Sequence, residues 1–577
     1  MKKNPLIFAV LLAAVSCGGP EDGTYRLQLF TTNDVHGRYF DSLYVEEGTR
    51  QSLYAVSHYV DSVRNADGAE NVILIDAGDC LQGDNAAYYY NYVDTITPHL
   101  YARMANYMKY DAVVVGNHDV ETGHPVYDRV AKQLDAPFMG ANAIRNDNGK
   151  PYFADYTIVR RNGLKVAVLG FTNPNMKNWL SEDLWSGMHF ESLIPIVQED
   201  VDRVIASEHP HVVIVAVHAG TGNGDGSSLE SQGMDLFKTL EGVDFLVCSH
   251  DHRPFVTSRE DICLINSGSH CRNIGHGVVT LEVKDGKVVS KELSAGLIPV
   301  RKNAVDKEMS KVFRKDYEAV RDFTVKPVGT LEEDLVTRDS YAGMCSYMNL
   351  LHTLSLSCSP ARISFAAPLT FNGHVKAGTL VYNDLFTIYP FENQLFVVKM
   401  SGKEIKDYLE YSYDSWINTV SGVKGEHLLK ITNTPDPRTG LERWSFTGRA
   451  YNFDSAGGLV YTVDVTRPCG QRVEIVSLAD GTRFSMDGSY NVAMTSYRAS
   501  GGGAIMREGA GIDTDNIESR VVAKYPEIRN ILYDYITEHG SIDPAETGNE
   551  NVIGKWSFIP EKMASDMLEK DMELLFE

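Results

Sequence analysis

The amino-acid sequence predicts an α/β fold for the first half of the chain and a smaller α+β domain after it. Between Tyr25 and about residue 295, short apolar runs rich in β-branched residues alternate with polar clusters and helical stretches. Such alternation is typical of a sandwich with a mixed or parallel sheet at its core. The pattern changes near residue 295, and 577 residues are too many for one hydrophobic core. We therefore expect two domains.

Seven apolar runs predict the strands of the first domain, and each run leads directly into a polar cluster. The runs cover residues 27–32, 71–75, 110–115, 164–169, 212–217, 245–248 and 262–265. Apolar residues at helical spacing predict helices over 52–65, 98–109 and 191–207. We place this domain at residues 25–299.

The second half of the chain begins with a charged helical stretch, 305–322, which has no strand beside it and predicts a linker within 300–335. A helix over 342–356 and several strands then predict an α+β domain over 336–545. These strands cover 394–400, 443–448, 458–465, 472–477 and 489–495. The tail, 546–577, contains an amphipathic helix that we expect to pack against the rest of the protein.

Residues 1–17 have the pattern of a processing segment. Lys2 and Lys3 precede an apolar run, 6–15, that is too short to span a bilayer. Ala14-Val15-Ser16-Cys17 resembles a bacterial lipoprotein box, which predicts cleavage before Cys17 and a lipid anchor on its thiol. An ordinary secretion signal is the alternative. The lipoprotein reading places the protein in the bacterial cell envelope, periplasmic or surface-exposed, with the lipid as its only contact with the membrane.

The net charge limits the class of binding partner, and the cysteine spacing indicates whether disulfides are expected. The formal net charge of −23, with no basic stripe to offset it, argues against a nucleic-acid polymer. Bound metal could still attract a small anion. Seven cysteines follow Cys17 without CxxC spacing, which favours free thiols over a disulfide framework.

The most informative stretch is Gly116-Asn117-His118-Asp119-Val120-Glu121-Thr122-Gly123. It follows a buried strand and precedes a helical pattern that begins at Pro125. An amide, an imidazole and two carboxylates are thus predicted at a strand-to-helix turn. Ligands of open α/β sheets bind at such turns.

Similar polar residues close the other predicted strands. The combined set is Asp34, His36, Asp79, Asn117, His118, His218, His250 and His252. Any one of them alone is usually an ordinary loop residue. Together, their mixture of oxygen and nitrogen donors suits Zn, Mn or Fe better than Ca. Without His118, and with Asp79 bridging, the set offers about four bonds to each of two ions, a device used for attack on phosphorus.

The motifs Asn33-Asp34-Val35-His36-Gly37, Gly78-Asp79, Gly116-Asn117-His118-Asp119 and His250-Asp251-His252 resemble the calcineurin-like metallophosphoesterase family. With the second domain, residues 25 to 540 resemble the two-domain 5′-nucleotidase superfamily. This resemblance implies a four-layer αββα catalytic domain, two divalent metal ions and a metal-bridging hydroxide that attacks phosphorus. It assigns Asp34, His36, Asp79 and His252 to one ion, and Asp79, Asn117, His218 and His250 to the other.

The resemblance gives His118 a different role, contact with the phosphate and protonation of the leaving oxygen, while Asn117 helps to stabilise the developing charge. The family often places an acid three residues after this histidine. Here that residue is Glu121, one methylene longer than the usual Asp. Glu121 either orients His118 or is an ordinary carboxylate at a helix start.

Four segments of the second domain look most like the branch of 2′,3′-cyclic-nucleotide 2′-phosphodiesterase/3′-nucleotidases. They are 364–368, 389–393, 451–454 and 496–503, and they lack the usual ribose-binding Asp and phosphate-clamping Arg of 5′-nucleotidases. By resemblance, Phe453 and Tyr497 would stack on a base, with Tyr451 in reserve; core packing is the alternative. The glycine run 501–503 fits either a close backbone approach to ligand or a surface turn.

We therefore expect a dinuclear-metal phosphohydrolase acting on 2′,3′-cyclic nucleotides or on 3′- or 5′-nucleoside monophosphates, with a hinge in 300–335. Two alternatives remain. One is the same chemistry on a nucleotide sugar or another phosphate or sulfur ester. The other is a non-enzymatic lipoprotein that captures a ligand. The sequence does not indicate the oligomeric state.

Overall fold

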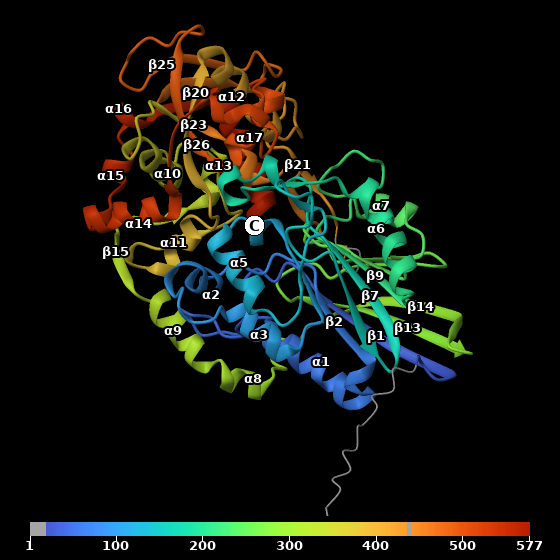
Figure 1. Ribbon diagram of the computed structural model, residues 1–577. Coiled ribbons are helices and arrows are strands. Elements are labelled where there is room, and N and C mark those ends of the chain that lie inside the picture. The colour runs from blue at the N-terminus through green and yellow to red at the C-terminus, as the bar shows by residue number, and fades with distance from the viewer. Residues whose placement is uncertain (1–18, 436–439) are drawn as a thin grey trace, which may run out of the picture.

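The computed structural model describes residues 19–435 and 440–577, which form two domains joined by a pair of helices (Figure 1). The predicted signal segment and its Cys17 lie outside the described residues. In the described part, no helix combines the length and the apolar character needed to cross a membrane. The seven cysteines after Cys17 are all unpaired.

Two six-stranded sheets form the first domain. The first has the order β14-β13-β1-β2-β3-β4, with β1 Gly23–Thr32, β2 Val72–Asp76, β3 Ala112–Val114, β4 Phe138–Met139, β13 Asn273–Lys284 and β14 Lys287–Pro299. The second has the order β11-β12-β10-β9-β7-β6, with β6 Tyr156–Arg161, β7 Leu164–Phe171, β9 Val212–Val217, β10 Phe245–Val247, β11 Phe255–Ser258 and β12 Cys263–Asn266. Strands β1 to β4 run parallel, as do β7, β9, β10 and β12.

The two sheets pack face to face, and helices cover both outer faces. Residues such as Leu29, Ile75 and Ile214 fill the space between the sheets. Helices α1 (Leu53–Asp67), α3 (Leu100–Met108) and α5 (His124–Gln133) cover the first sheet, and α6 (Leu193–Glu208) and α7 (Gly233–Thr239) cover the second. The central strands are thus buried on both faces, which explains their continuous apolar runs. The predicted αββα sandwich is confirmed.

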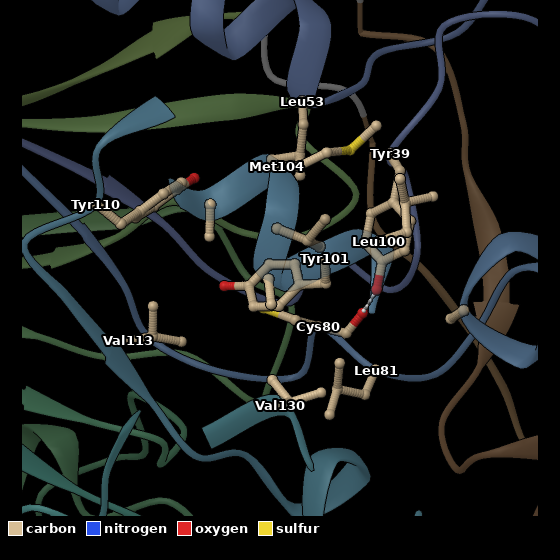
Figure 2. Close-up of a cluster of buried hydrophobic side chains, with 14 of the residues drawn as sticks. Tyr39, Leu53, Cys80, Leu81, Leu100, Tyr101, Met104, Tyr110, Val113 and Val130 are labelled. Carbon is tan, nitrogen blue, oxygen red and sulfur yellow. Dashed lines mark hydrogen bonds between the residues drawn. The ribbon is translucent and has the colours of Figure 1, made fainter. Parts of the chain in front are cut away.

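Aromatic and sulfur-containing side chains pack under α3, next to the loop that follows β2 (Figure 2). Within this cluster, the Tyr39 hydroxyl donates a hydrogen bond of 2.6 Å to the carbonyl of Cys80. The loop that carries Asp79 therefore rests on a filled core, which limits its movement.

The predicted linker helix is two helices, α8 (Lys307–Val312) and α9 (Arg314–Thr324), with a break at Phe313. Met309, Phe313 and Val320 are buried in the core of the first domain. Strand β15 (Pro327–Leu331) already pairs with β19 (Gly378–Val381) and β28 (Ser541–Ile542) in the second domain. The chain therefore passes between the domains at Val325 and Lys326.

A five-stranded sheet of order β23-β17-β26-β20-β27 forms the centre of the second domain. Its strands are β17 Ile363–Ala366, β20 Gln394–Ser401, β23 Ser455–Gly457, β26 Ser489–Thr495 and β27 Val521–Glu527. Helices α10 (Ser346–Ser357) and α14 (Ile528–His539) pack on one face, and α12 (Gly402–Trp416) packs on the other. Helix α10 begins four residues later than the sequence suggests, because a 3-10 turn, Thr337–Tyr341, and Gly343 with φ of 151° precede it.

The residues separated in the sequence as a tail are integrated into the second domain. Strand β29 (Gly554–Ile559) pairs in parallel with β24 (Leu459–Asp464) beside β25 (Val473–Leu478). Helix α17 (Glu561–Phe576) buries Leu568 and Leu575 in the same core. The expected packing of the amphipathic helix is thus observed.

Besides the linker helices, two connections of the first domain contact the second domain in the described part of the chain. Tyr88 of the first domain is buried among core residues of the second and donates to Asn530 Oδ1 at 3.1 Å. On the loop after β7, Lys177 lies 3.4 Å from a carboxylate oxygen of Asp515, and Ser181 Oγ lies 3.4 Å from Gln394 Oε1. Both contacts involve first-domain loops at the carboxyl ends of strands.

Candidate metal centre and substrate site

Loops at the carboxyl ends of five parallel strands bring the predicted ligands together. Asp34 and His36 follow β1, Asp79 follows β2, and Asn117 begins the short helix α4 (Asn117–Val120) after β3. His218 follows β9 in the second sheet, and His250 and His252 follow β10. Both sheets thus contribute donors at the same edge of the sandwich.

One group of donors consists of Asp34, His36 and His252, whose ligand atoms lie within 4.8 Å of one another. The Nε2 atoms of His36 and His252 face each other at 2.9 Å, and His252 Nε2 lies 3.5 Å from Asp34 Oδ1. Two ring nitrogens directed at one point beside a buried carboxylate are a donor set that fits a divalent cation.

The second group contains Asp79, His218 and His250, again within 4.8 Å, together with Asn117. His218 Nε2 lies 3.1 Å from Asp79 Oδ2 and 3.1 Å from Asn117 Oδ1. His250 Nδ1 lies 2.9 Å from the same Asn117 oxygen. The carboxylate, amide and imidazole donors again fit a cation of the Zn, Mn or Fe class.

The backbone at this centre is held in a costly conformation. Five of the seven predicted ligands have positive φ: Asp34 (48°), His36 (47°), Asp79 (60°), His250 (69°) and His252 (59°). Such values are uncommon for residues with a side chain, and they concentrate at functional sites. The left-handed residues turn their side chains back over the strand ends, where the donors meet.

Two glycines permit the close approach of the loops. A Cβ on Gly78 would lie 2.6 Å from His218 Nδ1 and 2.8 Å from the nitrogen of Gly116, and a Cβ on Gly116 would overlap Asp79. Replacement of either glycine would therefore displace a candidate ligand. This explains the glycines of the Gly-Asp and Gly-Asn motifs.

Burial and mutual charge govern protonation in the ion-free centre. Burial raises the pKa of Asp34 to about 8. Burial lowers the pKa of His218, but the charge of Asp79 more than compensates and raises it to about 10. A cation that binds here would displace these protons, because the ligand forms are the deprotonated ones.

His118 faces the centre without belonging to either donor group. Its ring lies 5.4 Å from that of His36, and its Nδ1 lies 2.5 Å from Glu121 Oε2. Burial lowers the pKa of His118, but the charges of Asp79 and Glu121 together raise it to about 9. An imidazolium held by a carboxylate can donate a proton from Nε2. The orienting role of Glu121 remains a prediction, with the contact it requires in place.

Asp119 was not among the predicted site residues, yet it holds the metal-site loops together. Its carboxylate accepts backbone N–H groups of Asp79 (3.0 Å), Cys80 (2.9 Å), Leu81 (2.9 Å) and Gly116 (2.8 Å). Its place in Asn117-His118-Asp119 marks it in the sequence, but its target is a loop forty residues away along the chain.

Three further residues around the centre were missed. Trp179 stacks on His250 with ring centroids 5.0 Å apart, and a Glu230 oxygen lies 3.9 Å from His250 Nε2. The His270 ring lies 5.3 Å from that of His36. His270 follows β12 as the predicted ligands follow other strands, which is a usable signal. Trp179 and Glu230 lie on long loops and have no local signal.

The structure contradicts the placement of Phe453 in the base-binding site. Phe453 is only 1% exposed, and its ring stacks on Trp416 at 5.8 Å and meets Phe446 edge-on at 5.2 Å. A ring enclosed in this way has no free face for a base. The 3-10 turn Ala450–Asn452 ends at Phe453, and the rings of Tyr451 and Phe453 contact different sets of aromatic residues.

Tyr451, held in reserve, lies beside the predicted Tyr497. The two rings meet edge-on at 6.4 Å, and Phe391 approaches Tyr451 at 6.0 Å. All three side chains are partly exposed. They form an aromatic surface, Phe391-Tyr451-Tyr497, of the kind that binds a flat ring.

A buried ion pair fixes this aromatic surface. Arg498 donates to Asp454 through Nε (2.9 Å) and Nη2 (2.8 Å), and both side chains are buried. Arg498 also donates to the Tyr451 carbonyl at 3.1 Å and lies 5.5 Å from the centre of the Tyr497 ring. One guanidinium thus joins the two segments that carry the tyrosines.

The glycine run serves the same packing. A Cβ on Gly502 would overlap the Tyr497 ring, and Gly503, with φ of 71°, lies against Arg498 and Asn452. The Gly502 carbonyl accepts a hydrogen bond from Arg498. These glycines permit a close approach within the protein itself, beneath the tyrosine.

Comparison with known proteins agrees with this architecture. Residues 28–254 match the calcineurin-like phosphoesterase family, and residues 327–508 match the 5′-nucleotidase C-terminal domain. The chain is 25% identical over 605 residues to the trifunctional nucleotide phosphoesterase YfkN of Bacillus subtilis, covering 93% of this chain but 39% of that protein. It thus spans well under half of YfkN.

Two further comparisons cover nearly the full length of both proteins. A 2′,3′-cyclic-nucleotide 2′-phosphodiesterase/3′-nucleotidase of Yersinia enterocolitica is 22% identical over 632 residues, covering 95% of this chain and 92% of its own. The crystal structure of a candidate 5′-nucleotidase from Staphylococcus aureus shares the fold, with a TM-score of 0.75 and 20% identity over 92% of this chain and 99% of its own. The protein therefore belongs to the metallophosphoesterases of the two-domain 5′-nucleotidase superfamily, in which a calcineurin-like phosphoesterase domain precedes a 5′-nucleotidase C-terminal domain.

Proposed function

We propose that the protein hydrolyses nucleotides, with 2′,3′-cyclic nucleotides and 3′-nucleoside monophosphates as the preferred substrates and 5′-nucleoside monophosphates as a weaker one. The observation that carries this proposal is the convergence of seven donors from five loops into two groups, with His118 beside them. The relatives named as nucleotide phosphoesterases support the substrate class.

In this proposal, Asp34, His36, Asp79 and His252 hold one divalent ion, and Asp79, Asn117, His218 and His250 hold the other. When bound, the ions supply the positive charge that activates water and offsets the charge of the phosphate oxygens. Asp79 lies in the second donor group, and its Oδ1 also accepts the His118 backbone N–H at 2.8 Å. That bond aligns the proton donor with the centre.

His118 protonates the leaving ribose oxygen from Nε2, while Glu121 holds Nδ1 at 2.5 Å. The contact keeps Nε2 directed away from Glu121, and the charge of Glu121 favours the protonated ring. Asn117 adds an amide dipole beside the reacting phosphate.

The second domain supplies recognition of the base. Tyr451 and Tyr497 present aromatic faces to any base, and each stack is worth roughly 1–3 kcal/mol. Burial raises the pKa of Tyr389 and of Glu392, and the charge of Glu121 raises both further. Glu121, beside the proton donor of the first domain, is therefore within electrostatic range of the second domain, which carries the aromatic surface.

We also place the domain boundary at Val325 and Lys326. We further propose that Cys17 carries a lipid that anchors the protein to the cell envelope. The signal pattern of residues 1–17 supports the anchor. Metabolic labelling with radioactive palmitate, lost in Cys17→Ala, would test it; a label that persists in this variant would contradict it.

The function is tested by assaying the purified protein with Mn²⁺ on a matched panel: 2′,3′-cyclic AMP, 3′-AMP, 5′-AMP, a nucleotide sugar and an aryl sulfate. We expect kcat/KM to be greatest for the cyclic and 3′ substrates. Metal-loaded protein that turns over none of the three nucleotides would refute the proposal. Preferred turnover of the nucleotide sugar or the sulfate would replace it with the corresponding alternative.

A further inference from the structure

The two histidines of the second donor group are held in different ways. His218 is fully buried, and its Nδ1 faces the Ala77 carbonyl at 2.8 Å and Ser249 Oγ at 3.0 Å. The main chain therefore fixes the ring, and Nε2 is left for the ion. His250 is 17% exposed and lies on a loop with φ of 69°. Its ring needs another means of orientation.

Glu230 lies beside the nitrogen of His250 that faces away from the donor group. His250 Nδ1 points to Asn117 at 2.9 Å, whereas His250 Nε2 points to Glu230 Oε2 at 3.9 Å. The Glu230 backbone is anchored, since its carbonyl accepts from Gly220 N at 3.0 Å and Asn173 Nδ2 at 3.2 Å.

Trp179 fixes the plane of the same ring. Its indole lies nearly parallel to the His250 imidazole, at 23° and 5.0 Å between centroids. Trp179 follows the 3-10 turn Met176–Asn178 and also packs against the first-domain core. Rotation of the His250 ring out of this plane would break the stack.

We propose that Trp179 and Glu230 are positioning residues that direct His250 Nδ1 toward the ion shared with Asp79, Asn117 and His218. The inference rests on the proposed function, because it assumes that this group binds a divalent ion. At 3.9 Å, Glu230 Oε2 is at ion-pair distance from His250 Nε2, beyond hydrogen-bond distance, so it acts on the ring through its charge. Residues that orient a metal-bound histidine through its second nitrogen typically cost about 10–100-fold in metal affinity when they are lost.

The same two residues do not touch the other donor group. Asp34, His36 and His252 belong to loops after β1 and β10, and neither Trp179 nor Glu230 is a partner in their described contacts. Weakening of His250 should therefore lower the affinity of one ion and leave that of the other unchanged.

The test uses the full-length protein, stripped with a chelator and titrated with Mn²⁺ by calorimetry, with metal content measured after desalting. The variants are Glu230→Gln, which keeps the shape, Trp179→Leu, which removes the stack, and Trp179→Phe, which preserves an aromatic face. Glu182→Gln, on the exposed part of the Trp179 loop, is the matched control. Circular dichroism and thermal unfolding identify any variant that is not folded.

We expect two ions per chain in the wild type and the control. In Glu230→Gln and Trp179→Leu, the Kd of one ion rises about 10–100-fold and that of the other does not change. Trp179→Phe remains within about threefold of the wild type. Tight binding of both ions by folded Glu230→Gln and Trp179→Leu would overturn the inference, as would equal weakening of both ions. A wild type that binds no Mn²⁺ would instead refute the proposed function.

Tryptophan fluorescence provides a second readout that, like calorimetry, does not depend on turnover. Because Trp179 stacks on His250, binding of the ion held by the second donor group should change the tryptophan fluorescence. In Glu230→Gln, the fluorescence change should occur at a higher Mn²⁺ concentration than in the wild type. In Trp179→Phe, it should disappear. An unchanged fluorescence titration in Trp179→Phe would assign the signal to another tryptophan and count against the stack.

Discussion

The two domains build their parts of the site by different means. In the first, donors stand on strand ends, and main-chain hydrogen bonds to Asp119 fix the loops. In the second, two tyrosines stand on irregular segments that a single side-chain ion pair, Arg498–Asp454, holds together. In the proposed function, the chemistry thus depends on the sheet framework and the recognition of the base on side-chain contacts. Changes in the first domain should therefore act on kcat for every substrate, and changes in the second on KM for nucleotides.

The largest effect is expected from Asp79→Asn, since Asp79 belongs to the second donor group and the proposed function assigns it to both ions. Loss of several kcal/mol of electrostatic stabilisation corresponds to about a 10³-fold or larger fall in kcat. The fall should be equal for 3′-AMP and for p-nitrophenyl phosphate, because no base recognition is involved. Steady-state kinetics with metal analysis measure it, with Asp225→Asn on an exposed loop as the control. A variant that keeps wild-type kcat on either substrate would contradict the bridging role.

His118→Asn should lower kcat for 3′-AMP by about 10²–10⁴-fold, the usual contribution of a general acid. The loss should be much smaller for p-nitrophenyl phosphate, because its leaving group needs no proton. Glu121→Gln should reproduce a weaker form of the same pattern, because its carboxylate holds His118 Nδ1 at 2.5 Å. Equal losses on both substrates would show that His118 acts in another way.

In the second domain, Tyr451→Ala and Tyr497→Ala should each raise KM for nucleotides by about 5–150-fold, equivalent to 1–3 kcal/mol per stack. Turnover of p-nitrophenyl phosphate should not change. Phe453→Ala is the informative contrast: it should destabilise the fold by about 3–5 kcal/mol, because a core ring is removed. Denaturant unfolding and KM measurements separate the two outcomes. A Phe453→Ala protein of normal stability with a raised KM would restore Phe453 to the base-binding site.

The smallest effect concerns pH and stability, and a buried histidine outside the donor groups illustrates it in each domain. Burial lowers the pKa of His99 in the first domain and of His352 in the second to about 3. The unfolded chain binds protons below its pKa of about 6.5, whereas the native state does not until near 3. Stability is therefore complete above pH 6.5 and is lost as the pH falls toward 3.

Between pH 7 and pH 5, each histidine should lower the free energy of unfolding by at most about 2 kcal/mol. In His352→Gln, the second domain loses this dependence while His99 keeps it in the first. Thermal unfolding at both pH values should show a smaller shift for the variant than for the wild type. The same shift in both proteins would contradict the assignment.

The strands and donors of the first domain could be predicted from the sequence because short stretches of residues mark each of them. Runs such as 212–217 are buried on both faces and are apolar throughout, and the donors follow them directly. The hairpin β13–β14 was not predicted from the sequence. Its residues alternate between more and less buried positions, as in β13, so no continuous apolar run marks it. The positions of Asp34, Asp79 and His218 followed from one rule, that parallel strands end at one edge.

The second domain shows the limit of that rule. Phe453 and Tyr451 are two residues apart beside the 3-10 turn Ala450–Asn452, yet Phe453 is buried in the core and Tyr451 is partly exposed. Trp179 and Glu230 reach His250 from loops that carry no periodicity. Such placements depend on tertiary packing, which neither residue type nor spacing reveals.

The single passage of the chain between the domains, at Val325 and Lys326, has an evolutionary consequence. Among the described residues after Lys326, no strand joins a sheet of the first domain, so one recombination point could exchange the second domain while every candidate donor stays at the edge of its own sheet. Tyr88 sets the condition for such an exchange, because an incoming half would have to offer the same aromatic socket that receives it here.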